Sequence, residues 1–214
     1  MSETFVGYDP GGNRAHGLAE LQVADGKPIS IISRTLRSAE EVIAGLEVLA
    51  SVSALGVDTL SCWSTGGGGW RPADRWLREQ KQYEKVRNSV TTPNGLFGSM
   101  SLNGMAVLVE SRRKFPNVMI TETHPKVLYF ALSGKTHDYK SRKSEMDAFL
   151  SDKLGIPRSH FTIGDEHQWD AALSALAAHA GLRGLWRRDL HELAPVKGER
   201  LVRPCGATHY YWPE

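Results

Sequence analysis

The stretch that decides the fold reads Phe5-Val6-Gly7-Tyr8-Asp9-Pro10-Gly11-Gly12. Its apolar beginning predicts a short buried strand over residues 4–9, and Pro-Gly-Gly predicts a turn directly after it. Asp9 therefore stands where a strand ends. An acid at that place is costly to bury unless it is paired or bound to a metal ion, although an Asx turn would also explain it. Asp9 is the first candidate functional residue.

The residues that follow predict a sheet that begins as an antiparallel meander. Asp25-Gly26 is a strong hairpin turn, and Ser38 with Glu41 three residues later resembles the capping box of a helix that carries Val42, Leu46, Leu49 and Val52 on one face. Further strands are predicted over residues 15–24, 28–35 and 54–58. Ribonuclease H-like domains begin in this order, with three strands, a crossover helix and a fourth strand.

The rest of the chain predicts the remaining layers of one α/β domain. Residues 61–117 read as an irregular or helical insertion, with helices near 73–86 and 101–114 and a loop over 91–100. A fifth strand is predicted over 118–122, and helices near 126–132 and 144–154. Asp165 caps a last helix that runs to about Ala180, and a short strand or extended arm ends the chain. We expect a mixed five-stranded sheet with helices on both faces.

Composition restricts the class of protein. The chain has 214 residues, of which 41% are hydrophobic and 23% charged, with a net charge of +2. This predicts a soluble globular protein, and no apolar run is long enough to span a membrane. The beginning of the chain has no signal-peptide pattern, so the cytoplasm is expected, with Cys62 and Cys205 reduced. The sequence does not indicate an oligomeric state.

Three further carboxylates join Asp9 as candidates. Asp58 follows the apolar run Ala54-Leu55-Gly56-Val57, Glu122 ends Val118-Met119-Ile120-Thr121, and Asp170 lies in the first turns of the last helix. A turn explains Asp58 and the helix dipole explains Asp170, but Glu is uncommon in strands. Sites in such sheets form at the carboxyl ends of the strands. Four clustered carboxylates would need a divalent cation, and their oxygens suit Mg²⁺ or Mn²⁺.

Other residues are weaker candidates. Arg71 follows a run of four glycines and could line the cleft or simply begin a helix. Lys140 could contact a phosphate or lie on a solvated surface, and His124 could assist the site or form a structural corner before Pro125. His167 and Glu166 are possible additional ligands. The four glycines lack a following Gly-Lys-Ser/Thr, which excludes a Walker loop.

Several short motifs occur together in one order along the chain. They are Gly7-Tyr8-Asp9-Pro10-Gly11-Gly12, Val57-Asp58-Thr59-Leu60, Arg71-Pro72-Ala73-Asp74-Arg75, Glu122-Thr123-His124-Pro125 and His167-Gln168-Trp169-Asp170-Ala171. In this order they resemble the family called domain of unknown function 429, described as predicted nucleases with a ribonuclease H-like fold. The resemblance implies an acidic active centre that maps to Asp9, Asp58, Glu122 and Asp170. Lys126 departs from the family pattern, in which an acid often follows His-Pro.

The leading hypothesis is a metal-dependent phosphodiester hydrolase that acts on DNA or RNA, with basic groups positioning the backbone. A ribonuclease H-like module that binds nucleic acid or a nucleotide without cleaving it is the alternative. A phosphotransferase on a related fold would need a second, duplicated half, for which the chain has no room.

Overall fold

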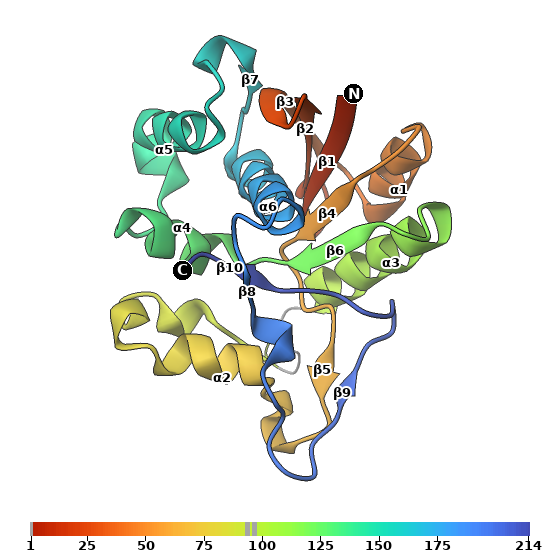
Figure 1. Ribbon diagram of the computed structural model, residues 1–214, viewed down its shortest axis with the longest axis vertical. Helices are drawn as coiled ribbons and strands as arrows, with labels where there is room; N and C mark the ends of the chain where they lie inside the picture. The colour runs from red at the N-terminus through yellow and green to blue at the C-terminus, as the bar shows by residue number, and fades with distance from the viewer. Residues whose placement is uncertain (1, 93–94, 96–97) are drawn as a thin grey trace.

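The computed structural model describes residues 2–92, 95 and 98–214, and its centre is a six-stranded sheet of order β6-β4-β1-β2-β3-β7 (Figure 1). β1, β2 and β3 form an antiparallel meander, β4 and β6 continue parallel to β1, and β7 pairs parallel with β3. The strands are β1 Ser2–Asp9, β2 His16–Ala24, β3 Lys27–Leu36, β4 Ala54–Val57, β6 Met119–Glu122 and β7 Phe161–Thr162. This arrangement confirms the predicted ribonuclease H-like fold and adds a sixth strand to it.

Helices cover both faces of the sheet, as predicted. One face packs against α1 (Ala39–Glu47) and α3 (Gly98–Lys114), with Val42 and Leu108 in the shared core. The other face packs against α6 (Glu166–Leu182), beside which lie α4 (Pro125–Ser133) and α5 (Tyr139–Leu154). Ser38 caps α1 by accepting a hydrogen bond from the backbone of Glu41, as predicted.

Glycines in the sheet allow α6 to lie directly against it. A Cβ on Gly7 of β1 would lie 1.8 Å from the carbonyl oxygen of Ala171, and one on Gly56 of β4 would lie 1.9 Å from that of Ser174. Gly17 of β2 stands in the same relation to the backbone of His167, at 1.9 Å. No side chain fits at these three positions without moving the helix. The glycines therefore fix how deeply α6, and with it Asp170, approaches the strand ends.

The insertion forms a separate set of elements beyond the carboxyl ends of β4 and β6, at the bottom of Figure 1. It contains β5 (Trp63–Ser64) and α2 (Pro72–Glu79), and β5 pairs with β9 (Leu201–Val202). β8 (Arg188–Asp189) and β10 (Tyr211–Trp212) form another two-stranded pair. Within the described residues there are also five 3₁₀ turns: Gly67–Gly69, Lys81–Tyr83, Arg87–Ser89, Arg158–His160 and Leu190–Glu192.

Several predicted boundaries were wrong. The helix expected near 73–86 ends at Glu79, because Gln80 takes an extended conformation, and a 3₁₀ turn follows. α5 begins at Tyr139, where Asp138 caps it, five residues before the predicted start. In the loop expected over 91–100, residues 93–94 and 96–97 lie outside the described residues, and α3 already begins at Gly98. No helix in the described ranges is long and apolar enough to cross a membrane.

Candidate functional site

Three of the four predicted carboxylates converge at the carboxyl ends of the central strands. Asp9 is the last residue of β1, Asp58 follows β4, and Asp170 projects from α6. β1 and β4 are parallel neighbours with Tyr8 opposite Val57, so Asp9 and Asp58 leave the sheet side by side. One oxygen from each carboxylate can be chosen so that all three lie within 4.8 Å of one another. Asp9 and Asp170 are buried, and Asp58 is partly buried.

The burial and mutual repulsion of these carboxylates raise the pKa of two of them, Asp9 and Asp58. Burial, together with the nearby charge of Asp170, raises the pKa of Asp9 to about 7, although a hydrogen bond from His167 opposes the shift. Burial and the charges of Asp9 and Asp170 raise the pKa of Asp58 well above its ordinary value, while Lys126 lowers it. Carboxylates that repel one another in a confined space are stabilised as anions by added positive charge or by hydrogen bonds that they accept.

The donor set fits a hard divalent cation. All three groups are carboxylates, and oxygen ligands are those that Mg²⁺, Mn²⁺ and Ca²⁺ prefer. Beside them lies a cavity of about 320 Å³, which we call the carboxylate cavity. Its lining includes the three aspartates, Pro10, Gly11, Gly12, Ala15, Ser99, Met100, Lys126, Glu166 and His167. The three carboxylates thus face a cavity that other polar side chains share.

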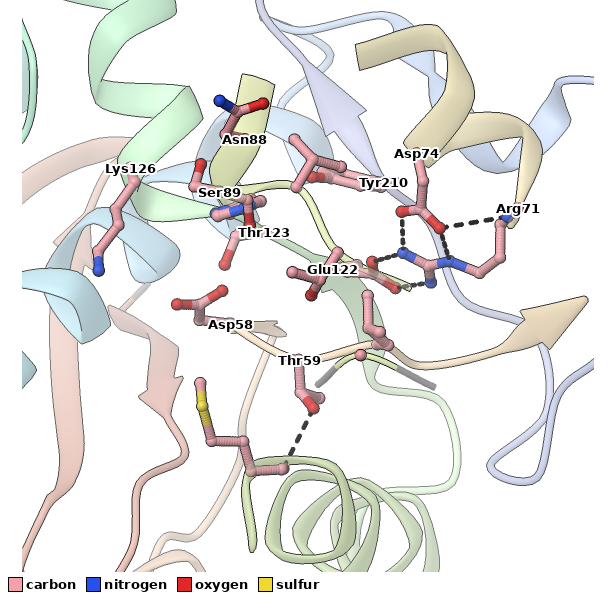
Figure 2. Close-up of a pocket in the computed structure, with 16 residues that line it drawn as sticks. Asp58, Thr59, Arg71, Asp74, Asn88, Ser89, Glu122, Thr123, Lys126 and Tyr210 are labelled. Carbon is pink, nitrogen blue, oxygen red and sulfur yellow. Dashed lines mark hydrogen bonds and ion pairs between the residues drawn. The ribbon is translucent and has the colours of Figure 1, made fainter. Parts of the chain in front are cut away.

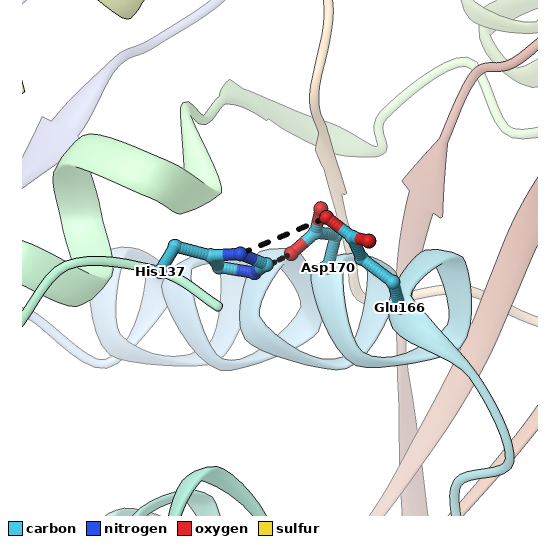
Figure 3. A group of neighbouring side chains, drawn as sticks. All are labelled: His137, Glu166 and Asp170. Atoms are coloured by element: carbon cyan, nitrogen blue, oxygen red, sulfur yellow. Dashed lines mark hydrogen bonds and ion pairs between the residues drawn. The ribbon is translucent and has the colours of Figure 1, made fainter. Parts of the chain in front are cut away.

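Two histidines hold the outer oxygens of the cluster. The Nδ1 atom of His167 lies 2.7 Å from Asp9 Oδ2, and this hydrogen bond raises the pKa of His167. His137 Nε2 lies 2.7 Å from Asp170 Oδ1, with Glu166 close to the other ring nitrogen at 3.7 Å (Figure 3). Sequence reasoning singled out His167 and missed His137. His137 lies in a connection between helices, where no periodicity or motif signals a contact with α6.

The fourth predicted carboxylate, Glu122, is held by a different partner. Arg71 donates from Nη1 and Nη2 to its two oxygens at 2.8 and 2.5 Å, and also donates to both oxygens of Asp74 (Figure 2). Arg71, Asp74 and Glu122 are each no more than 2% exposed. Glu122 is not part of the group of three converging carboxylates, although its charge still acts on Asp58.

Further hydrogen bonds complete the surroundings of Glu122. Its Oε2 accepts from the backbone and the hydroxyl of Ser61 at 2.9 and 3.0 Å, and His191 Nε2 lies 3.4 Å away. Burial alone would raise the pKa of Glu122, but Arg71 and His191 hold it below its ordinary range. Conversely, burial opposes the charged form of His191, yet contacts with Cys62 and Glu122 raise its pKa to about 10.

The three predicted substrate-binding residues lie in different environments. Arg71 is 1% exposed and fully engaged by carboxylates. His124 lies between β6 and α4, and its Nε2 atom is 3.0 Å from the carbonyl oxygen of Ser89; burial lowers the pKa of His124. Lys140 is exposed on α5 and contributes to the lining of neither cavity next to Asp58. Lys126, the second residue of α4, does line the carboxylate cavity.

The chain thus combines a ribonuclease H-like fold with three converging carboxylates at the ends of its central strands. No protein-family model matches the chain, so the resemblance to the domain of unknown function 429 family gains no support from that comparison. No curated protein matches either. Among solved structures, the chain is similar to T. thermophilus RuvC in complex with a Holliday junction substrate. The two share 17% identity and a TM-score of 0.43 over 85% of this chain and 96% of that chain.

Proposed function

We propose that this protein is a metal-dependent phosphodiester hydrolase that acts on DNA or RNA. The observation that carries the proposal is the convergence of Asp9, Asp58 and Asp170 at the open end of the sheet. Such a cluster is unfavourable without a cation, and it faces a cavity rather than the core. A bound Mg²⁺ or Mn²⁺ would polarise a phosphodiester and lower the pKa of a water molecule.

We assign the residues around the proposed site different roles. Asp9, Asp58 and Asp170 would hold the ion, while His167 and His137 orient the outer oxygens of Asp9 and Asp170. Histidines and other groups that orient metal ligands commonly strengthen metal binding. Lys126 lines the carboxylate cavity and makes no ion pair within the described part of the chain, so its ammonium is available to a phosphate oxygen.

The test is cleavage of labelled DNA and RNA, single-stranded, double-stranded and branched, with Mg²⁺ or Mn²⁺ and with a chelator. We expect cleavage that needs the metal ion and that falls by about 10³-fold or more in Asp9→Asn and Asp58→Asn. Asp152→Asn, a change at an exposed carboxylate on α5, is the matched control and should cleave normally. Cleavage that persists in both site variants would refute the assignment.

A module that binds nucleic acid without cleaving it is the second candidate, and one observation favours it. Lys126 acts on Asp58 from within the same cavity and supplies positive charge without a metal ion. Calorimetric titration with Mn²⁺ separates the two functions. Uptake of an ion at or below millimolar concentration, lost in Asp9→Asn, supports the hydrolase. Absence of uptake, together with intact binding of nucleic acid, supports the module.

A further inference from the structure

A second cavity adjoins the metal-binding carboxylates on the side of the insertion (Figure 2). We call it the Tyr210 cavity; it has a volume of about 270 Å³. Its lining is Asp58, Thr59, Leu60, Arg71, Asp74, Asn88, Ser89, Val90, Thr91, Gly95, Met100, Glu122, Thr123, His124, Lys126 and Tyr210. Asp58, Met100 and Lys126 also line the carboxylate cavity, so a ligand could occupy both cavities at once.

The charges around the Tyr210 cavity exclude a second phosphate as its occupant. Two cations, Arg71 and Lys126, line it together with three carboxylates, Asp58, Asp74 and Glu122. Arg71 is already neutralised by Asp74 and Glu122, and Lys126 lies on the side toward Asp58 (Figure 2). An anion would meet excess negative charge there, which leaves a cation or an uncharged group, and the apolar walls of Leu60, Val90 and Met100 favour the uncharged group.

The lining also offers a polar side chain that can form hydrogen bonds with an uncharged occupant. Asn88 is exposed to solvent and lines the cavity, and its side-chain amide forms no hydrogen bond with the described residues (Figure 2). An amide offers two donors and one acceptor, which suits the edge of a nucleobase. Leu60, Val90 and Met100 supply apolar walls for a ring.

We propose that the Tyr210 cavity receives one unpaired nucleobase of the strand whose phosphate lies at the carboxylates. This inference rests on the proposed function and names its substrate class: DNA or RNA with an unpaired nucleotide at the cleavage site. The volume is near the lower end for pockets that hold small ligands, and it suits a single base. A paired base cannot enter, because it is held in the stack of the duplex.

The experiment compares three labelled duplexes, each made as DNA and as RNA: one fully paired, one with a single unpaired nucleotide, and one with an abasic residue in the unpaired position. The unpaired position carries each natural base in turn. Affinity is measured by fluorescence anisotropy with the Asp9→Asn protein, which keeps the probes intact. We expect the unpaired nucleotide to bind about tenfold more tightly than the paired and abasic probes for at least one base.

Asn88→Ala should reduce this preference about fivefold, as expected for the loss of a hydrogen bond. Asn117→Ala is the matched control, because Asn117 is exposed at the opposite end of β6. Equal affinity for all three probes, or a preference that survives Asn88→Ala, overturns the proposal. Cleavage by the wild-type protein without preference refutes the base cavity alone. If the unpaired nucleotide is bound preferentially but the wild-type protein cleaves none of the probes, the base-binding role of the Tyr210 cavity is supported and the hydrolase is refuted.

Discussion

The contact between Arg71 and Glu122 gives the sharpest prediction about how the site is built. The perturbation is Glu122→Gln, which keeps the shape of the side chain and removes its charge. If Glu122 serves mainly as the counter-ion of Arg71, this change lowers stability and leaves metal affinity nearly unchanged. If Glu122 is instead a fourth metal ligand, Mn²⁺ affinity falls strongly.

The magnitude follows from the burial and the hydrogen bonds of the pair. Arg71 and Glu122 are each 1% exposed and joined by two hydrogen bonds. Removing one partner of such a buried ion pair costs about 3–5 kcal/mol. In a chain of this length each kcal/mol lowers the Tm by about 2–4 °C, so we expect a loss of roughly 6–20 °C. Because the pKa of Glu122 is lowered by folding, the contribution is complete above about pH 4.3 and is lost in more acidic solution.

The assay is urea unfolding combined with Mn²⁺ calorimetry, on Glu122→Gln, Arg71→Met and the double variant. The double variant should lose clearly less than the sum of the single variants, since both remove the same interaction. The control is Arg75 with Glu199, an ion pair that is partly exposed. Breaking it should cost less than about 1 kcal/mol. A loss below 1 kcal/mol in Glu122→Gln, or a tenfold fall in its Mn²⁺ affinity, would refute the reasoning.

Three further predictions concern the carboxylates and the helix that carries one of them. Without metal, the folded protein keeps a proton on Asp9 up to about pH 7, so the free energy of unfolding should fall as the pH rises from about 4 to 7, relative to that of Asp9→Asn. Thermal unfolding of both proteins at several pH values measures this change. A difference in stability between the two proteins that does not change with pH contradicts the prediction. Gly7→Ala should cost several kcal/mol, at least about 2, because its Cβ would overlap the backbone of Ala171, and urea unfolding measures the loss. His137→Ala should weaken Mn²⁺ binding about 10-fold to 100-fold in calorimetry by freeing Asp170, whereas unchanged affinity would refute that positioning role.

The central sheet could be predicted from the sequence because its signals are local. Alternation and turn residues indicate β1, β2 and β3, and the cap at Ser38 marks the start of α1. The proximity of Asp9 and Asp58 could also be predicted, because the carboxyl ends of neighbouring parallel strands meet at one edge of the sheet. The strand β7 could not be predicted, since its two residues carry no periodicity.

The partner of Glu122 could not be predicted for a different reason. Arg71 follows a glycine-rich turn in the insertion, and its path to β6 depends on contacts between segments far apart in the chain. In the sequence, Asp58 and Glu122 are both acidic residues at the end of a strand, and no neighbouring residue indicates that their surroundings differ. Only the folded insertion pairs Glu122 with a guanidinium and leaves Asp58 facing the carboxylate cavity.

The different surroundings of Asp58 and Glu122 determine which carboxylates at the strand ends still lack a compensating positive charge. Glu122 and Asp74 are compensated by Arg71 and His191, so they do not require a metal ion. The remaining three carboxylates carry three negative charges, and Lys126 faces them with one positive charge. A single divalent ion would make this group neutral, whereas a second ion would leave it strongly positive until a phosphate arrived. The charge of Lys126 and the ion pair between Glu122 and Arg71 therefore act in the same direction, and they favour one ion over two at the metal site that we propose.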